Sequence, residues 1–404
     1  MTLSIVIPAY NEEQAIANII ERCLAARERI IAATPVDAVE IIVVSDGSVD
    51  RTPELARSYE PEVQVIAYVP NRGYGAALKT GFAASRGELV SFLDADGTCD
   101  PLNFIPMVNK LVDEGADIAI GSRMGPDSRM PKVRRLGNRI FRGIINWLGR
   151  AQISDAASGM RVIRRDRLGG IYPLPDGLHF TPAMSCRAVL DLHLKIVEIS
   201  MSYEERVGRS KLRVVTDGLR FARVIGAIAI TYRPLRFFAI PGLLLLLAAL
   251  LYGVGLIGRY LRTGGIDDDM IYRMVGITAF GVGGLHLVLL GVLADNVVAV
   301  LKRQYRRGSA AHRLLRQVTA PGLLLPLSVL GLAAAVGADW RALVEYLSTG
   351  HITAHWSFVV FGLFMALLSI ELVGFVAMNH LVSLLRAERE EAPAPLGVAG
   401  ERGR

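Results

Sequence analysis

Apolar residues are spaced differently in the two halves of the chain. In roughly the first 230 residues, short β-branched runs alternate with amphipathic segments, whereas Leu, Val, Ala, Gly and Phe dominate from Leu235 to Leu385. The first pattern is typical of a mainly parallel sheet covered by helices. The second contains four apolar stretches of the roughly 20 residues that cross a hydrocarbon core about 30 Å thick. We therefore predict a soluble α/β domain followed by an α-helical transmembrane domain.

Seven strands are predicted for the α/β domain, which we expect to cover residues 1–213. Their β-branched runs lie at Leu3–Pro8, Ile41–Ser45, Val63–Tyr68, Leu89–Leu93, Ile118–Gly121, Arg161–Ile163 and Lys195–Ser200. Helical patterns follow several of them, at Glu13–Ala32, Tyr74–Ser85 and Phe104–Glu114. Such sheets bind ligands at the carboxyl ends of their strands, so polar residues at those ends are the candidates for a site.

The predicted transmembrane domain covers residues 235–386, with spans at about 235–257, 274–301, 318–338 and 356–385. Before it, residues 214–234 carry basic side chains on an apolar segment, a pattern that predicts an interfacial helix on the membrane surface. After it, residues 387–404 form a polar tail rich in Ala, Pro and Glu, for which we predict disorder.

Two acidic residues interrupt the predicted spans. Ionisable groups inside a membrane are costly, so they usually face protein or water rather than lipid. We expect Glu371, at mid-span, to face another helix, with His286 as a candidate partner. Asp295 is expected near the cytoplasmic end of its span.

Basic residues are concentrated in one loop of the transmembrane domain. Lys302–Arg316 contains six Lys or Arg and no acid, whereas the loop after the first span contains Asp267, Asp268 and Asp269. Basic loops stay in the cytoplasm, so we predict a multi-pass protein of the cell (inner) membrane with a cytoplasmic N-terminal domain. Three scattered cysteines favour reduced thiols. A basic loop beside anionic lipid headgroups explains the net charge of +7 without a nucleic-acid partner.

Polar motifs follow the first three predicted strands. PAYNEE (Pro8–Glu13) is either a ligand-contacting turn or a simple turn in which Asn11 caps the next helix. In SDGSVDRT, the carboxylate of Asp46 at a strand end can accept hydrogen bonds from the N–H groups of uracil or guanine. In the glycine-rich turn NRGYGAALKTG (Asn71–Gly81), backbone N–H groups are expected to face phosphate, with Lys79 reaching the nucleotide.

The fourth predicted strand runs into SFLDADGTCDP. Because side chains alternate along a strand, we expect Asp94 and Asp96 on the same side. Two carboxylates at a strand end suit Mg²⁺ or Mn²⁺, which bridges the diphosphate of a nucleotide-sugar and neutralises charge on the leaving nucleoside diphosphate. The alternative is a solvated acidic turn, which leaves the motifs at the other strand ends without an explanation.

Together these motifs resemble the inverting family-2 glycosyltransferases of the GT-A fold, in order and spacing, over most of residues 1–213. Three further segments resemble the polyprenyl-phosphate hexose synthases, of which dolichol-phosphate mannose synthase is the best-known type. They are GSR (Gly121–Arg123), SDAASGMRVIRR (Ser154–Arg165) and YEERVGRSKL (Tyr203–Leu212). The resemblance implies a nucleotide-sugar donor and a polyprenyl phosphate acceptor, such as undecaprenyl or dolichyl phosphate.

The resemblance and the chemistry of phosphate binding also suggest roles for individual residues. Contacts to the nucleotide-sugar are expected from Pro8, Tyr10, Glu12, Asp46, Lys79, Asp94, Ala95 and Asp96. The metal ligands would be Asp94, Asp96 and Thr98, which stands where the family usually has Gln. The acceptor phosphate would contact Arg123, Arg134, Arg135 and Arg206. The catalytic residues would be Asp96, Arg206 and Lys211.

A lipid phosphate acceptor agrees with two features of the sequence. The Q-x-x-R-W signature of processive polysaccharide synthases is absent, and the chain has SDAASG rather than the motif that carries their general-base Asp. A phosphate monoester has a second pKa near 6 and is largely ionised at neutral pH. The site then needs positioning and positive charge rather than a strong base. Asp155 is a candidate base or a structural residue.

The sequence thus predicts metal-dependent, inverting transfer of a hexose from a nucleoside-diphosphate sugar, of the GDP-mannose or UDP-glucose type, to polyprenyl phosphate at the cytoplasmic membrane face. One alternative is a glycosyltransferase with another acceptor, such as a diacylglycerol or a growing glycan. A second is a lipid-sugar transporter with an inactive nucleotide-binding domain, against which the intact DAD, SDGS and RSK motifs argue.

Overall fold

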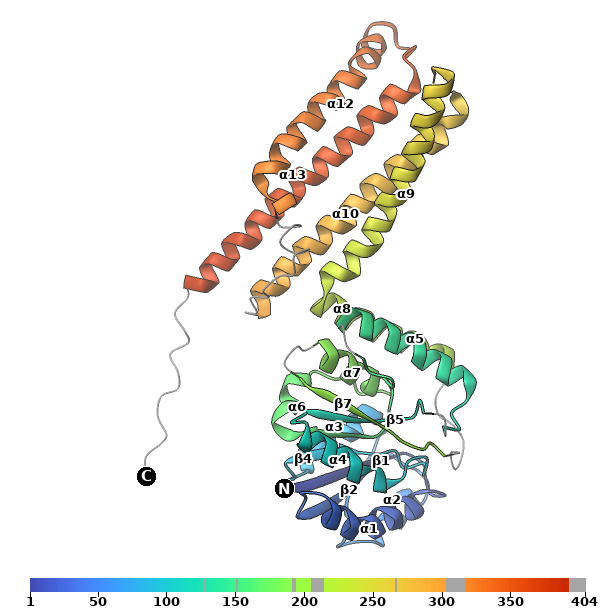
Figure 1. Cartoon of the computed structure of the whole chain (residues 1–404), viewed down its shortest axis with the longest axis vertical. Helices are drawn as coiled ribbons and strands as arrows, with labels where there is room; N and C mark the ends of the chain where they lie inside the picture. Colours follow the sequence, from blue (N-terminus) through green and yellow to red (C-terminus); the bar gives the residue numbers. More distant parts are fainter. Residues whose placement is uncertain are drawn as a thin grey trace. The chain divides into compact units, whose positions relative to one another are not determined.

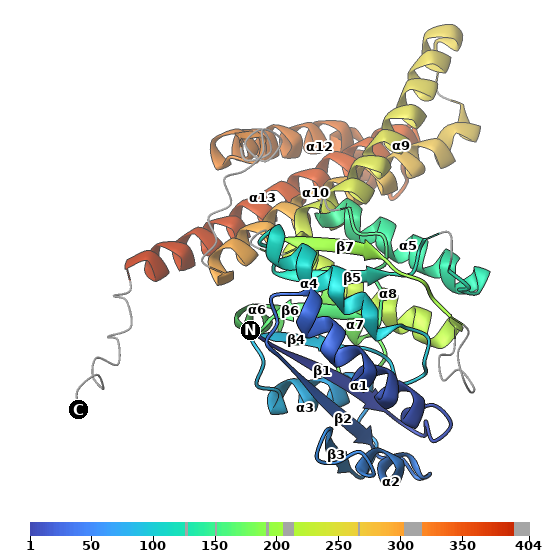
Figure 2. The ribbon, with the colours of Figure 1, turned by 60° about the horizontal axis from the view of Figure 1, so that its bottom comes forward.

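The computed structural model describes residues 1–125, 128–149, 152–190, 194–204, 214–265, 267–302 and 317–391. The chain divides into two compact units, Met1–Ala229 and Ile230–Arg404. The first contains a sheet with helices around it, and the second is built from long helices (Figures 1 and 2). Both predicted kinds of domain are therefore present.

Within the described residues, a seven-stranded sheet forms the centre of the N-terminal unit, in the order β3-β2-β1-β4-β6-β5-β7. β6 runs antiparallel to β4 and β5, and the other neighbouring pairs are parallel. All seven predicted strands are confirmed, with small shifts of their ends. They are β1 (Thr2–Ala9), β2 (Ala38–Asp46), β3 (Gln64–Tyr68), β4 (Leu89–Phe92), β5 (Ile118–Ser122), β6 (Arg161–Arg164) and β7 (Ile196–Ser200).

Helices pack on this sheet through apolar stripes. α1 (Ile16–Ala33) buries Ile16, Ile19, Ile20 and Cys23 in the same core as the apolar residues of β1, the spacing that puts side chains on one helix face. Three predicted helices are confirmed as α1, α3 (Tyr74–Ala84) and α4 (Phe104–Asp113). The other helices of this part are α2 (Thr52–Arg57), α5 (Lys132–Gly149), α6 (Arg165–Ile171), α7 (Phe180–Leu190) and α8 (Val214–Tyr232), with the 3-10 turn η1 (Pro101–Asn103).

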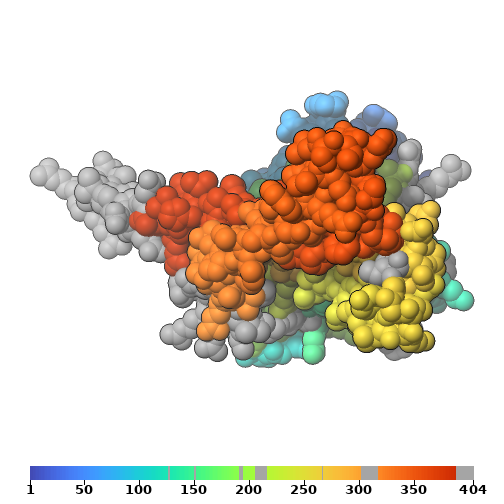
Figure 3. All heavy atoms as spheres, turned by 90° about the horizontal axis from the view of Figure 1, so that it is seen from above, coloured from blue at the N-terminus to red at the C-terminus, as the bar shows by residue number. Residues whose placement is uncertain are grey.

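Among the described residues of the C-terminal unit, four helices are long and apolar enough to cross a membrane, as predicted. They are α9 (Pro234–Thr263), α10 (Ile271–Lys302) with the preceding turn η2 (Asp268–Met270), α12 (Pro321–Thr349) and α13 (Trp356–Glu391). α12 and α13 pack against each other (Figure 3). Because α13 continues to Glu391, the predicted start of a disordered tail at residue 387 is wrong. Residues 392–404, and 303–316 of the predicted basic loop, lie outside the described residues.

Small and polar residues set the contacts between these helices. A Cβ on Gly242 of α9 would lie 2.7 Å from the Gly284 carbonyl oxygen of α10, so the two backbones approach closely only because both residues are glycine. His286 contacts Glu371 of α13 at 3.0 Å, which confirms the predicted partner. Asn296 donates to Asn379 at 2.7 Å, so a second polar pair joins α10 to α13. Both pairs satisfy groups that are costly to leave in lipid.

Candidate active site

The carboxyl ends of β1, β2 and β4 bring three of the predicted motifs to one edge of the sheet. β1 pairs with β2 as far as Ala9 and Ser45, and with β4 as far as Val6 and Phe92. Because all three strands are parallel, the loops that follow them emerge side by side. The PAYNEE, SDGSVDRT and DAD segments are therefore neighbours.

The turn after β1 is tied to the turn after β2. The side chain of Asn11 accepts a hydrogen bond from the Val49 N–H at 2.9 Å, and the Asn11 N–H donates to Ser48 Oγ at 3.1 Å. Asn11 has a φ of 49°, a left-handed conformation in which Asn is enriched. α1 begins only at Ile16 and has no side-chain cap, so the interpretation of Asn11 as a helix cap is wrong.

Three residues of this turn were expected to contact the nucleotide-sugar. Pro8 is buried in β1, and Tyr10 is exposed over 37% of its surface. Glu12 donates its N–H to Thr52 Oγ1 at 2.8 Å, while its carbonyl accepts the first hydrogen bonds of α1. Tyr10 is thus the most exposed of the three and Glu12 is half-buried, and contacts to the donor from this turn remain a prediction.

Asp46 holds the glycine-rich turn. Its two carboxylate oxygens accept the N–H groups of Arg72 and Gly73 at 2.7 and 2.8 Å. The N–H groups of Gly75 and Ala76 donate instead to the Asp176 carbonyl. These four N–H groups are satisfied by protein, so the expectation that they face phosphate is wrong for them. A carboxylate oxygen has more than one acceptor site, and contact between Asp46 and a base stays a prediction.

Lys79 lies on α3, and its ammonium group binds a segment far away in the sequence. It donates to the Leu174 carbonyl at 2.7 Å and forms an ion pair with Asp176 at 2.6 Å. Asp176 is thereby fixed at the start of α3, where its carbonyl takes the two N–H groups named above. The structure gives Lys79 a part in holding this loop, and its contact with a nucleotide stays a prediction.

The DAD segment is a turn rather than the end of a strand. β4 ends at Phe92, so strand alternation does not set the directions of Asp94 and Asp96 as the sequence suggested. Oδ1 of Asp94 accepts the Tyr74 hydroxyl at 2.8 Å. Oδ1 of Asp96 accepts both the Thr98 N–H at 3.2 Å and the Thr98 hydroxyl at 2.6 Å. Each carboxylate is therefore oriented by a specific neighbour, and Thr98 contacts Asp96 directly.

Residues that the sequence analysis did not single out complete this turn. A Cβ on Gly159 would overlap the Asp94 carboxylate, so the SDAASG segment passes directly over it and only glycine fits. Tyr74 is half-buried, and desolvation of its hydroxyl, followed by the Asp94 charge, raises its pKa well above the ordinary value. Its hydroxyl therefore stays protonated and donates to Asp94. Neither residue has a sequence signal of its own, since the contacts join segments 20 or more residues apart.

A divalent cation is compatible with the two aspartates. In the part of the chain that the structure describes, no group of three or more His, Cys, Asp or Glu side chains forms a metal site. Mg²⁺ commonly takes one or two carboxylates and completes its shell with substrate phosphates and water, so such a group is not required. The close pass of Gly159 keeps side-chain bulk away from Asp94. Asp94 and Asp96 fit a metal shared with a diphosphate, and Thr98 as a ligand stays a prediction.

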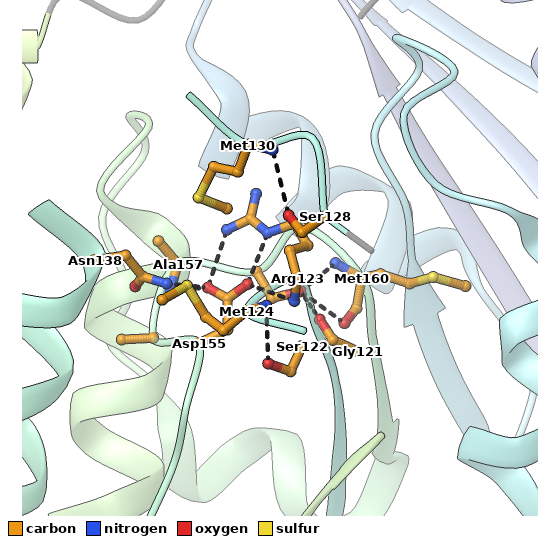
Figure 4. Close-up of polar contacts among 12 residues, drawn as sticks. Gly121, Ser122, Arg123, Met124, Ser128, Met130, Asn138, Asp155, Ala157 and Met160 are labelled. Carbon is orange, nitrogen blue, oxygen red and sulfur yellow. Dashed lines mark hydrogen bonds and ion pairs between the residues drawn. The ribbon is translucent and has the colours of Figure 1, made fainter. Parts of the chain in front are cut away.

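Arg123, expected at the acceptor phosphate, forms a buried ion pair with Asp155 (Figure 4). Its Nε and Nη2 donate to the two carboxylate oxygens at 2.7 and 3.0 Å, and its backbone N–H donates at 3.0 Å. Asn138 of α5 adds a fourth hydrogen bond to Asp155 at 2.8 Å. Burial raises the pKa of Asp155, but attraction to Arg123 and these hydrogen bonds outweigh it and leave the pKa below its usual range. Of the two roles considered for Asp155, the structure favours the structural one over the base.

The segment that begins at Tyr203 starts beside the aspartate turn. The Glu204 N–H donates to the Thr98 carbonyl at 3.1 Å, and the Arg123 guanidinium lies 5.4 Å from the centroid of the Tyr203 ring. Residues 205–213 lie outside the described residues, and with them the predicted catalytic residues Arg206 and Lys211. The described part nevertheless brings the start of this basic segment next to the DAD loop.

Two further arginines expected at the acceptor phosphate lie on α5. Arg135 donates to the Ser128 carbonyl at 2.9 Å, and both Arg134 and Arg135 are half-buried. Ser128 in turn forms a β-bridge with Tyr203. The start of α5 is therefore joined through residues 128–129 to the segment beside the DAD loop, and phosphate contacts from these arginines stay predictions.

Tyr74→Phe tests the hydrogen bond to Asp94. Losing a hydrogen bond to a charged group costs about 1.5–3 kcal/mol, so we expect catalysis by this variant to fall at least about tenfold. The concentration of divalent metal that gives half the maximal rate should rise as well, because Asp94 is less well oriented in the variant. Steady-state rates across a metal titration measure both effects. Tyr59→Phe is the matched control, since Tyr59 donates to Glu21 at 2.7 Å on the surface. Equal rates for the two variants would contradict the positioning role.

Comparisons with known proteins agree with this geometry. A sequence profile described as Glycosyl transferase family 2 matches residues 4–169. The low-salt glycan biosynthesis hexosyltransferase Agl6 of Haloferax volcanii is 32% identical, over 72% of this chain and 68% of its own length. A dolichyl-phosphate hexose transferase from the same organism is 32% identical, over 57% of this chain and 95% of its own length.

Among solved structures, glucosyl-3-phosphoglycerate synthase from Mycobacterium tuberculosis, in complex with Mn²⁺, UDP and phosphoglyceric acid, aligns with a TM-score of 0.46. It is 22% identical and covers 56% of this chain and 78% of its own. The profile match extends from β1 through β6 and includes the DAD turn and the Arg123–Asp155 pair. The N-terminal unit is thus a GT-A-type domain, and the chain belongs to family 2 of the glycosyltransferases.

Proposed function

We propose that this glycosyltransferase transfers one hexose from a nucleoside-diphosphate sugar to a polyprenyl phosphate, undecaprenyl or dolichyl phosphate, with inversion. One observation carries the proposal. The Glu204 N–H binds the Thr98 carbonyl, so the segment with Arg206 and Lys211 begins against the turn that holds Asp94 and Asp96. A donor diphosphate at the aspartates would then lie close to a source of positive charge for the acceptor.

The acceptor class is supported by the relatives and by the state of Asp155. One relative is a dolichyl-phosphate hexose transferase. A lipid phosphate is already ionised near neutral pH and needs no general base. Asp155 is wholly buried and paired with Arg123, so it is poorly suited to take a proton from a sugar or glycerol hydroxyl. This observation favours a phosphate over a hydroxyl acceptor.

The donor side is proposed to use Mg²⁺ or Mn²⁺ held by Asp94 and Asp96. Such a cation neutralises negative charge on the leaving nucleoside diphosphate. The residues of the chain supply the rest of the site. Tyr74 and Thr98 orient the two carboxylates, and Asp46 fixes the turn between β3 and α3. The proposed donor is a nucleotide-sugar of either the GDP-mannose or the UDP-glucose type.

The four apolar helices support a membrane protein, since they are long enough to span a bilayer. We propose the cell (inner) membrane and a cytoplasmic N-terminal unit. The basic composition of Lys302–Arg316 supports this orientation, because Lys and Arg are enriched in cytoplasmic loops.

The proposal is tested by supplying the purified full chain with polyprenyl phosphate and a panel of labelled nucleotide-sugars. The expected result is one hexose on the lipid phosphate, lost on addition of EDTA. Transfer to diacylglycerol or a glycan, but not to polyprenyl phosphate, would show that the proposed acceptor is wrong. Failure to consume any donor, together with transport of a lipid-linked sugar, would favour the transporter alternative.

Arg206→Ala is expected to lower the transfer rate about a hundredfold, because one charge-assisted contact of roughly 3 kcal/mol is lost in the transition state. Arg206→Lys should recover part of the rate, since Lys keeps the charge but not the paired hydrogen bonds of a guanidinium. Nucleotide affinity should be unchanged, which separates this loss from a defect in donor binding. Near-normal transfer by Arg206→Ala would leave the residue as surface charge.

A further inference from the structure

His286 of α10 and Glu371 of α13 use only half of their polar atoms in the contact between the two helices. His286 Nδ1 lies 3.0 Å from Glu371 Oε2, and among the described residues neither side chain makes another hydrogen bond. The ring nitrogen Nε2 and the carboxylate oxygen Oε1 have no partner there. The two side chains are exposed over 54 and 31% of their surfaces. In a helix that crosses a membrane, such atoms would lie in hydrocarbon, which offers no hydrogen bonds.

The pair lies near the middle of both helices. α10 has 32 residues and begins at Ile271, so His286 lies about 22 Å along its axis, close to the midpoint. Glu371 lies equally far from the start of α13 at Trp356. The centre of a hydrocarbon core is about 15 Å from either side, which is too deep for headgroups to reach. Ionisable groups at this depth face protein or a water-filled cavity.

The pair belongs to one exposed side of the two helices. At 100° per residue, Val275 and Ala279 lie within about 20° of His286 around α10, and both are exposed. On α13, Met378 lies within about 20° of Glu371 and is exposed as well. We call this side the α10–α13 face and define it by these five residues.

Glycines beside the pair leave room for another helix. Gly283 lies about 60° from His286 around α10, and Gly374 lies about 60° from Glu371 around α13. A Cβ on either glycine would meet nothing within 4 Å, whereas a Cβ on Gly284 would lie 2.8 Å from a carbonyl oxygen of α9. Small residues let helix backbones approach closely in a membrane, and polar side chains then hydrogen-bond across the contact.

The charges of the α10–α13 face favour a second copy of this chain as its occupant. In a contact with two-fold symmetry, residue i of one copy meets residue j of the other, and j meets i. His286 of each copy would then meet Glu371 of the other, so the atoms without a partner would satisfy one another. Residues 237–258 of α9 and 321–338 of α12 contain no His, Asp, Glu, Lys or Arg. A head-to-tail contact with either helix would therefore leave the pair without a charged partner.

From these observations we propose that two copies of the chain associate in the membrane through the α10–α13 face, with His286 and Glu371 of the two copies alternating in a ring. An imidazolium donates from both nitrogens, Nδ1 to the Glu371 of its own chain and Nε2 to the Glu371 of the other. Two imidazolium groups and two carboxylates have no net charge, as buried ions require. The proposal rests on the membrane location of these helices and not on the proposed reaction.

Two charge variants of the full chain, carrying different affinity tags, test pairing between copies. His286→Glu leaves two carboxylates at the face, and Glu371→His leaves two imidazoles. Each variant alone should associate about tenfold more weakly than the unchanged chain, because neither can form the alternating pairs. Expressed together, they should associate again, since the carboxylates of one copy meet the imidazoles of the other. Capture of one tag from membranes in mild detergent, with detection of the second tag, measures association.

The chain that carries both His286→Glu and Glu371→His is the matched control. It keeps one imidazole and one carboxylate, so it should associate with itself as the unchanged chain does. A pair that acts only inside one chain would also tolerate this exchange, but mixing the two single variants could not then restore association. Failure of the mixture while the control associates would overturn the proposal. No association of the unchanged chain, or equal association of all variants, would overturn it too.

A cross-linking probe keeps the pair intact and covers the case in which the charge variants fold poorly. Ala279→Cys places a thiol on the α10–α13 face, and Leu250→Cys places one on α9, where Leu250 is 62% exposed. The native cysteines Cys23, Cys99 and Cys186 are buried. A bismaleimide added to membranes should join two copies through position 279 and not through position 250. Equal yields at the two positions, no product at 279, or a product that joins 279 to a different protein would contradict the proposal.

Discussion

Asp96→Asn should lower transfer by at least about a thousandfold, the loss expected when several kcal/mol of charge stabilisation is removed from the transition state. The fold should survive, because an Asn side-chain oxygen can still accept the Thr98 N–H and hydroxyl that Asp96 Oδ1 now accepts. What is lost is the negative charge that would hold a cation. The measurements are the transfer rate and calorimetric titration of Mn²⁺ in the presence of nucleotide.

Asp100→Asn is the control for this substitution. Asp100 lies four residues further along the same loop and accepts the Leu102 N–H at 3.0 Å as a helix cap. Asn caps as well as Asp does, so this variant should keep near-normal transfer and Mn²⁺ binding. Transfer by Asp96→Asn that persists, and that EDTA does not abolish, would reject the metal assignment.

Asp155→Asn should destabilise the N-terminal unit by about 3–5 kcal/mol, because removing one partner leaves the other charge buried and unpaired. The carboxylate of Asp155 is wholly buried and the Arg123 side chain is only 12% exposed. For a domain of this size the loss corresponds to a fall in Tm on the order of 10 °C. Thermal unfolding of the purified chain, followed by tryptophan emission, measures it.

Asp166→Asn provides the comparison for a surface ion pair. Asp166 lies 3.6 Å from Arg167, which also pairs with Asp117 at 2.9 Å, and the Asp166 side chain is 68% exposed. Exposed pairs contribute about 0–1 kcal/mol, so the Tm should hardly change. A similarly small change in Tm for Asp155→Asn would contradict the expected loss and would show that water or a rearranged side chain stabilises the unpaired charge of Arg123.

The strands were predictable because their apolar runs are short, β-branched and separated by turn residues. The position of the ligand edge followed from parallel pairing, and the two loops after β1 and β2 are indeed bonded to each other. His286 and Glu371 could be paired from sequence because lipid offers neither group another partner. In each case a local pattern or a strong physical penalty left few arrangements.

The details of the turns were not predictable, since they depend on partners distant in the chain. The N–H groups of Gly75 and Ala76 were expected at phosphate, but the Asp176 carbonyl, about 100 residues later, binds them. Strand alternation was applied to Asp94 and Asp96 although β4 had already ended. α5 was not predicted at all, because its apolar stripe is interrupted by arginines and its place on the domain depends on Asn138 meeting Asp155.

The polar contacts between α10 and α13 also set an order of events during synthesis. His286 and Asn296 find their partners 85 and 83 residues later in the chain. At about 5–20 residues per second, the ribosome needs roughly 4–17 s to add those residues. Until then the imidazole and the amide of α10 have no α13 to bind, and lipid offers no replacement. α10 therefore makes its final polar contacts with α13 only after α13 has been made.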